Sequence, residues 1–152
     1  MSVHICSVVV AANAVTAFDL IHNYARRLEW DSMLREASLL DGATQAAEGV
    51  TSRCVAHWRM GWAAVESRYV TFKPGRIAAV EMTRGPWCFA AFAASIRHDD
   101  HADGTSRVTY CFNVKAGPCW LRFLIEPMLC RLLALETRWR LTALARFLRD
   151  TQ

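Results

Sequence analysis

Three polar residues within strand-like, apolar parts of the sequence have the side chains that proton-transfer chemistry requires. Glu66 and Arg68 are two residues apart, so they share one face if this segment is a strand, and Tyr110 lies in a separate strand-like run. A guanidinium can hold a developing oxyanion, a carboxylate whose pKa is raised by burial can act as a base, and a phenol can donate a hydrogen bond. Arg68, Glu66 and Tyr110 are therefore the candidate catalytic residues, although no motif that identifies an enzyme by itself surrounds them.

The chemistry open to Glu66 and Arg68 depends on which face of their strand points inward. If their face is inward, two charges lie on the wall of a pocket and must find a partner or a ligand. If it is outward, they form a solvated pair. The sequence leaves both readings open, because each face carries apolar residues: Ala64, Val70 and Phe72 beside the charged pair, and Val65, Ser67, Tyr69 and Thr71 on the other face.

The elements that would position these residues are mostly strands. Short breaks that contain glycine separate many of the apolar runs, and breaks of this length predict hairpins and hence an antiparallel meander. Two short helical segments, Ala14–Asn23 and Ala25–Met33, are expected between the first and second strands. The strands are expected at Val3–Ala11, Leu34–Leu40, Thr51–Met60, Ala64–Lys73, Arg76–Thr83, Trp87–His98 and Thr105–Lys115.

A long amphipathic helix is predicted from about Pro118 to Arg149. Pro127 lies inside it and predicts a kink, or a short helix followed by the main one. Glu136 and Arg140 have the spacing of an exposed ion pair on a helix. We expect the helix to pack against the sheet through an apolar stripe with spacings of three and four: Leu121, Leu124, Ile125, Met128, Leu132, Leu135 and Trp139.

Small residues on one face of the sheet predict a cavity between the sheet and this helix. In the run Trp87–His98, alternation places Ala90 and Ala94 inward, where small side chains leave volume unfilled. Ligand access is expected near Gly85-Pro86-Trp87, Gly61-Trp62 and the second short helix. The residues that we expect to contact a ligand are Trp30, Met33, Trp58, Met60, Met82, Ala90, Phe92, Ala94, Tyr110, Phe112, Leu132, Leu135 and Trp139.

The length predicts one domain, residues 1–152, and the composition is 53% hydrophobic and 21% charged residues. The net charge of +4 is scattered along the chain, with Arg26-Arg27 the only basic pair, so no nucleic-acid partner is expected. No apolar run reaches the roughly 20 residues that a membrane-spanning helix needs. The six cysteines form no C-x-x-C pair, and we expect no metal, no cofactor, a reducing cytoplasmic location and a monomer or weak homodimer.

Five short motifs carry a family resemblance. They are Ala17–Ile21 in the first helical segment, Glu29–Asp31 in the turn that follows, Ser67-Arg68 ahead of Pro74, Gly85-Pro86-Trp87, and Gly104–Tyr110. With the order of one strand, two helices, six antiparallel strands and a long helix, they resemble the START-like or SRPBCC superfamily, and within it the polyketide cyclase/dehydrase group. The resemblance implies an α+β helix-grip fold (Bet v 1-like or START-like), in which a curved antiparallel sheet of about seven strands wraps around the C-terminal helix. It also implies a deep cavity for a hydrophobic or aromatic ligand.

Members of this superfamily differ in what they do, so the resemblance leaves three functions open. The first, which we favour, is binding of a hydrophobic or aromatic small molecule, such as a lipid, a polyketide or a quinone-like compound, in the cavity. The second is a polyketide cyclase or dehydratase that uses the three candidate catalytic residues. The third is a protein-interaction or chaperone-like domain without a ligand, which a cavity collapsed by Trp58, Phe92 and Trp139 would favour.

Overall fold

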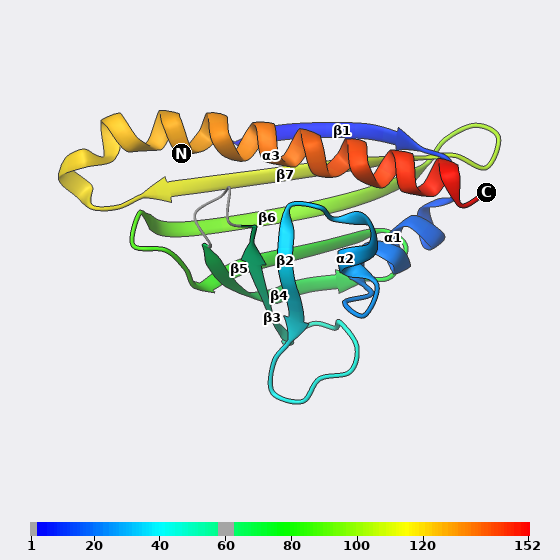
Figure 1. The fold of residues 1–152 in the computed structure, drawn as a ribbon, viewed down its shortest axis with the longest axis horizontal. Coiled ribbons are helices and arrows are strands. Elements are labelled where there is room, and N and C mark those ends of the chain that lie inside the picture. The colour runs from blue at the N-terminus through cyan, green and yellow to red at the C-terminus, as the bar shows by residue number, and fades with distance from the viewer. Residues whose placement is uncertain (1–2, 58–62) are drawn as a thin grey trace.

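The computed structural model describes residues 3–57 and 63–152, and the structural statements that follow concern these residues. They contain a seven-stranded antiparallel sheet in the order β1-β7-β6-β5-β4-β3-β2 (Figure 1). Each strand from β2 to β7 pairs with the next one in the chain, and β1 pairs with β7. The strands are β1 (His4–Val10), β2 (Leu34–Leu39), β3 (Thr51–Ala56), β4 (Ala64–Lys73), β5 (Ile77–Arg84), β6 (Phe89–Asp100) and β7 (Ser106–Ala116).

Helices lie between the first two strands and after the last one. α1 (Ala14–His22) and α2 (Arg27–Trp30) connect β1 to β2, and the 3-10 turn η2 (Cys119–Leu121) leads into α3 (Arg122–Asp150). α3 contacts β1 and β7 and runs beside them along the sheet (Figure 1). The predicted helix-grip architecture is confirmed: a curved antiparallel sheet holds one long C-terminal helix.

α1 is fixed at its start by two polar contacts. The side chain of Asn13 caps the helix by accepting a hydrogen bond of 2.8 Å from the backbone N–H of Thr16. The carboxylate of Asp100, at the end of β6, accepts a second one of 2.9 Å from the N–H of Ala14. These contacts hold the helix on the sheet, so that its last residue, His22, is placed at the cavity described below.

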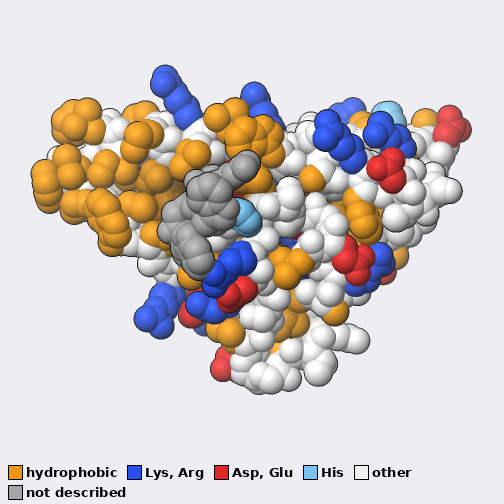
Figure 2. Space-filling view, in the orientation of Figure 1, with side chains coloured by type: hydrophobic (Ala, Val, Ile, Leu, Met, Phe, Trp, Pro, Cys, Tyr) orange, Lys and Arg blue, Asp and Glu red, His pale blue; other side chains and the backbone are white. Residues whose placement is uncertain are grey.

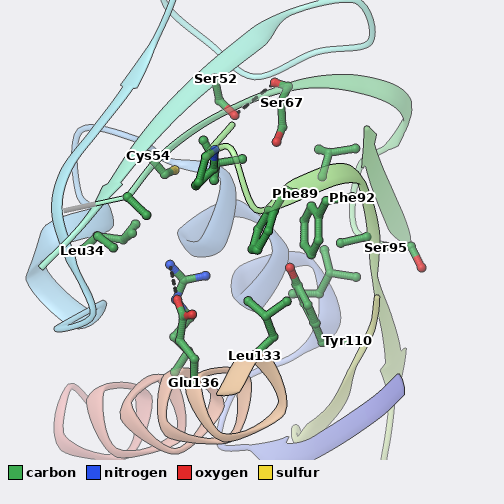
Figure 3. Close-up of a pocket in the computed structure, with 18 of the residues that line it drawn as sticks. Leu34, Ser52, Cys54, Ser67, Phe89, Phe92, Ser95, Tyr110, Leu133 and Glu136 are labelled. Carbon is green, nitrogen blue, oxygen red and sulfur yellow. Dashed lines mark hydrogen bonds and ion pairs between the residues drawn. The ribbon is translucent and has the colours of Figure 1, made fainter. Parts of the chain in front are cut away.

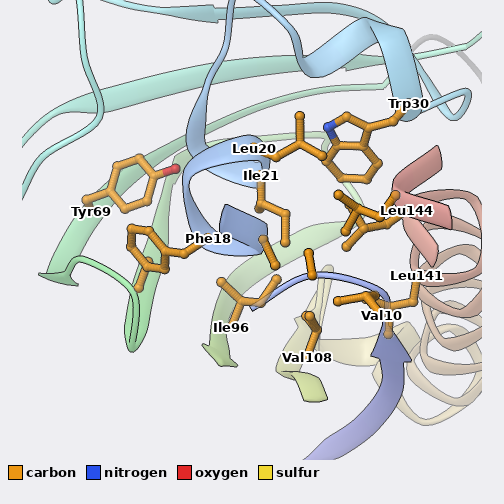
Figure 4. Packing of buried hydrophobic residues seen from close by; sticks show 14 residues of the cluster. Val10, Phe18, Leu20, Ile21, Trp30, Tyr69, Ile96, Val108, Leu141 and Leu144 are labelled. Atoms are coloured by element: carbon orange, nitrogen blue, oxygen red, sulfur yellow. The ribbon is translucent and has the colours of Figure 1, made fainter. Parts of the chain in front are cut away.

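The main hydrophobic core lies where α1, the C-terminal half of α3 and the sheet meet (Figure 4). Phe18 of α1, Val108 of β7 and Leu144 of α3 are among its most completely buried side chains. Ile21 and Tyr69 belong both to this core and to the lining of the cavity. The core therefore supports the cavity from one side.

The packing face of α3 differs from the predicted one. The buried residues of this helix are Leu129, Cys130, Thr137, Leu141, Leu144 and Leu148. Most of the predicted stripe is exposed instead, namely Leu124, Met128, Leu132, Leu135 and Trp139. The helix has two apolar stripes with helical spacing, and periodicity alone cannot tell which of two such stripes meets the sheet.

α3 also continues through Pro127. The predicted division into a short helix and a main helix is therefore wrong, and only the turn η2 precedes α3. Pro127 is the sixth residue of α3, so its missing N–H removes one helical hydrogen bond, the one to the carbonyl of Phe123 in the first turn.

Candidate functional site: a cavity between the sheet and the C-terminal helix

A cavity of about 490 Å³ lies between the inner face of the sheet and α3. This volume is within the range of pockets that bind small organic molecules. Its lining comes from β2 to β7, from α1 and α2, and from one side of α3. Figure 3 shows Leu34 and Cys54 on one side, Phe89 and Phe92 opposite them, and Glu136 reaching in from α3. Residues from distant parts of the chain thus surround one space.

Much of the lining is apolar. Phe89 and Phe92 stand next to each other with ring centroids 6.2 Å apart and nearly parallel planes. Leu132 and Leu133 of α3 complete this part of the wall, together with Val80 of β5. Such a surface offers area for burying an apolar or aromatic molecule and few groups that would hold water.

A network of four charged side chains lies at another part of the wall, and three of them, Arg27, Glu136 and Arg140, line the cavity. The carboxylate of Asp31 lies between two arginines: its Oδ2 accepts a hydrogen bond of 3.0 Å from Nε of Arg27, and its Oδ1 lies 3.3 Å from Nε of Arg140. Nη2 of Arg140 lies 3.4 Å from Oε1 of Glu136, one turn earlier on α3. Asp31 is fully buried. The two positive and two negative groups alternate, so their charges cancel.

Both arginines remain charged in this setting. Burial by itself lowers the pKa of Arg27 and of Arg140, but the nearby Asp31 carboxylate, joined by Glu136 for Arg140, raises it further, and the net pKa of each guanidinium lies above its ordinary value. Arg27 also donates a hydrogen bond of 2.8 Å to the carbonyl of Ile21 and lies 4.7 Å from the ring centroid of Trp30. The network therefore ties the segment after α1 to α3.

A second polar group is formed by two tyrosines and a histidine. The hydroxyl of Tyr69 lies 3.0 Å from the hydroxyl of Tyr24 and 2.9 Å from Nδ1 of His22. Burial, with a smaller effect from Arg27, lowers the pKa of His22 to about 3, so its ring is neutral at pH 7. Burial also raises the pKa of Tyr24 and Tyr69, which keeps both phenols protonated. This corner of the cavity is polar but uncharged.

Tyr110 presents a hydroxyl that forms no hydrogen bond among the described residues. It projects from β7 into the cavity near Leu133 (Figure 3). Burial raises its pKa to about 12, so the group is a neutral phenol at physiological pH. Tyr110 is partly buried, and a hydroxyl that faces a cavity without a protein partner is available to a ligand or to water.

Two of the three candidate catalytic residues lie outside the cavity. Nη2 of Arg68 lies 2.6 Å from a carboxylate oxygen of Glu81, and this pair is about half exposed. Glu66 faces Arg53 at 3.9 Å on the same outer face. The inner face of β4 is the other one, which carries Val65, Ser67 and Tyr69. The hypothesis of an Arg68 and Glu66 site is therefore wrong, and Tyr110 alone of the three reaches the cavity.

The predicted ligand contacts divide into three groups. Phe92, Ala94, Tyr110 and Leu132 line the cavity. Trp58 and Met60 lie outside the described residues. The structure places the remaining predicted contacts outside the lining: Trp30, Met33, Met82, Ala90, Phe112, Leu135 and Trp139.

Five of these seven differences have a local reason. An irregularity in the pairing of β6 with β7, between Phe89 and Ala91, shifts the alternation, so that Phe89 enters the cavity and Ala90 is exposed. Trp30 and Phe112 are buried, but among protein side chains rather than at the cavity. Leu135 and Trp139 are on the exposed stripe of α3.

Sequence reasoning missed most of the polar wall. Glu136 and Arg140, interpreted as an exposed helix pair, both line the cavity. The local signals of the network are two spacings of four, between Arg27 and Asp31 and between Glu136 and Arg140. Arg140 is far away in the sequence, so nothing in the linear pattern points to Asp31 as its partner.

Comparison with protein families agrees with the fold. Residues 6–149 match the model of a family described as polyketide cyclase/dehydrase and lipid transport. The chain belongs to this family. A comparison with curated protein sequences gave no match.

Solved structures with the same fold are distant in sequence. A START superfamily protein from Mycobacterium smegmatis superposes with a TM-score of 0.81 at 11% identity, covering 99% of both chains. The protein XoxI from Bacillus cereus gives 0.80 at 13% identity, covering 99% of this chain and 98% of the other. The ZhuI aromatase/cyclase from a Streptomyces species gives 0.74 at 15% identity, covering 97% and 93%. At such identities the likeness establishes the fold and not the ligand.

Two kinds of feature were not found in residues 3–57 and 63–152. No group of three or more His, Cys, Asp or Glu side chains there is arranged to hold a metal ion. No helix in this part of the chain is long and apolar enough to cross a bilayer.

Proposed function

We propose that the protein binds a hydrophobic or aromatic small molecule, a lipid, polyketide or quinone-like compound, in the cavity between the sheet and α3. The observation that carries this proposal is the Tyr110 hydroxyl, which has no hydrogen-bond partner among the described residues and faces a largely apolar cavity. Such a group favours a ligand with an apolar body and at least one hydroxyl or carbonyl oxygen.

The electrostatics of the wall favour a ligand without net charge. The charges of Arg27, Asp31, Arg140 and Glu136 already compensate one another. A ligand carboxylate or ammonium group would enter with no opposite charge left to offset its loss of hydration. A neutral ketone, quinone or phenol can instead exchange hydrogen bonds with tyrosine hydroxyls at a smaller desolvation cost.

Binding without turnover is the better supported reading. A cyclase or dehydratase needs a base near the reacting carbon. The carboxylate of Glu136 lies against Arg140, and the low pKa of His22 makes its ring a weak base. The open cavity also weighs against a domain that binds only other proteins. The free cysteines suit a reducing compartment, and we place the protein in the cytoplasm.

Native mass spectrometry before and after extraction with organic solvent tests the proposal. We expect the purified protein to carry an adduct in the mass range of a small organic molecule and to lose it on extraction. The extracted protein should then bind neutral aromatic or alkyl probes, such as anthraquinone or a long-chain alcohol, in isothermal titration calorimetry. An adduct-free mass together with no binding of either probe would overturn the proposal.

A further inference from the structure

The N-terminal half of α3 and the turn before it expose an apolar surface that the fold does not use. Trp120 and Phe123 are each 74% exposed and Met128 is 63% exposed. Figure 2 shows hydrophobic side chains gathered over this end of the molecule. We call this surface the outer face of α3, and its residues are Trp120, Phe123, Leu124, Met128, Leu132, Leu135 and Trp139.

The outer face is a continuous strip because of helical spacing. Leu124, Met128, Leu132, Leu135 and Trp139 follow one another at intervals of four and three residues, which places them along one side of the helix. The opposite side of α3 packs on the sheet. Single exposed apolar residues are ordinary on protein surfaces, but a run of large ones on one helix face indicates an interaction site.

The charges around the outer face are positive. Arg131 and Arg138 lie on the exposed side of the same helix. From Cys119 to Leu135 the only acidic residue is Glu126, and its carboxylate accepts a hydrogen bond of 3.1 Å from the backbone N–H of Ala116. Glu136 is mostly buried and lines the cavity. The surface therefore combines large apolar side chains with arginines, and no described residue of this face supplies a free carboxylate to match them.

We propose that the outer face of α3 docks on the surface of an anionic lipid bilayer. Helices that lie in the bilayer interface typically combine Trp, Phe and Leu with arginines. Their apolar side chains enter the acyl region and their cations contact anionic headgroups. A second copy of the chain fits less well. A two-fold contact would place this face against its own copy, which offers Arg131 and Arg138 no acidic partner.

Docking in this way brings the cavity to the bilayer. Trp87 and Leu132 both line the cavity and are exposed, so its wall reaches the protein surface at these residues. The carbonyl oxygen of Cys88 accepts a hydrogen bond of 3.0 Å from the N–H of Gly117, which holds the segment after Trp87 beside the start of η2. A hydrophobic ligand could then pass between the bilayer and the cavity without crossing water. Docking itself does not depend on the ligand.

Vesicle flotation with the full chain tests the proposal. We expect binding to vesicles of phosphatidylcholine mixed with phosphatidylglycerol, and much weaker binding to phosphatidylcholine alone. Phe123→Ser with Leu124→Ser should weaken binding about tenfold or more, because these side chains no longer enter the apolar region. The control is Val15→Ser with Leu28→Ser, which changes two exposed apolar residues of α1 and α2 and should leave binding unchanged.

The charge contribution has its own pair of variants. Arg131→Gln with Arg138→Gln should weaken binding about 25-fold at low salt, since each cation near an anionic surface contributes about fivefold. Arg146→Gln with Arg149→Gln, on exposed positions of the C-terminal half of α3, should have little effect. Equal losses in both pairs would show charge attraction without a docking face and would overturn the proposal.

Two further outcomes would also overturn it. One is no flotation with either type of vesicle. The other is a stable dimer in light scattering that Phe123→Ser with Leu124→Ser converts to a monomer, which would assign the face to a second copy. Binding of anthraquinone in the absence of vesicles is measured separately, so a failure of docking is distinguishable from a failure of the proposed ligand function.

Discussion

Arg140 of α3 and Asp31, the residue that follows α2, are joined inside the protein, with Nε of the arginine 3.3 Å from Oδ1 of the carboxylate. Asp31 also holds Arg27, so one buried carboxylate serves two cations. This relationship fixes the helical connection between β1 and β2 against the C-terminal helix. It also gives the cavity a polar wall whose charges compensate one another.

Replacement of Asp31 should strongly destabilise the fold. Asp31→Ala leaves two arginines close together without their shared carboxylate, and breaking a buried ion pair costs about 3–5 kcal/mol. The matched control is Glu81→Ala, which removes the exposed pair with Arg68 and should cost at most about 1 kcal/mol. Urea denaturation measures both. Equal losses of unfolding free energy would show that the buried network has no special role.

The two faces of α3 should respond differently to the same truncation. Leu144 is fully buried in the core, and Leu144→Ala should lower the unfolding free energy by about 2–5 kcal/mol. Leu135 is exposed on the outer face, and Leu135→Ala should change it by less than about 0.5 kcal/mol. Thermal or urea unfolding distinguishes the two. A larger loss for Leu135→Ala would mean that α3 packs through the other stripe.

The hydroxyl of Tyr110 should matter for the ligand and not for the fold. Tyr110→Phe removes one ligand hydrogen bond and should weaken binding by about two- to tenfold, with the unfolding free energy unchanged. Tyr69→Phe instead removes the contacts with Tyr24 and His22, and should lower stability. Calorimetric titration with anthraquinone measures the affinity of each variant, and urea unfolding measures its stability. Unchanged affinity in Tyr110→Phe would remove this hydroxyl from the site.

Stability should fall as the solution becomes acidic, with His98 as one cause. Burial lowers the pKa of His98 in the folded protein to about 4, against 6.5 for an exposed histidine. Between these values the unfolded chain binds a proton that the folded protein does not, so the unfolding free energy decreases as pH falls from 6.5 towards 4. The full effect is on the order of 3 kcal/mol. His98→Leu should flatten the dependence in urea melts at a series of pH values, and an unchanged slope would exclude His98 as its source.

Strand positions were predictable because alternation and turn residues are local signals. The segment Ala64–Lys73 was predicted with the bounds that the structure shows. Its inward face was not predictable, since both faces carry apolar residues, and only the tertiary fold places Glu66 and Arg68 outside. The orientation of α3 was not predictable for the same reason, because both of its stripes are apolar. The buried stripe even includes a polar residue, Thr137.

The polar wall could not be predicted for a different reason. Its partners come together only when α3 packs beside the segment after α1, and the preferred partner of a buried charge is set by that packing rather than by local spacing. The shift at Ala90 likewise depends on how β6 pairs with β7. In contrast, Phe92, Ala94 and Tyr110 were found because simple alternation continues unbroken through them.

The central claim is that a hydrophobic small molecule occupies the cavity, and a matched pair of substitutions on β6 tests it most directly. Ala94→Trp fills the cavity. Ala93→Trp places the same side chain one residue earlier in the strand, at a position that is not part of the lining. Both variants are titrated with anthraquinone after circular dichroism has shown that they fold. Loss of binding in Ala94→Trp with retention in Ala93→Trp is the predicted result, and wild-type affinity in Ala94→Trp would contradict the account.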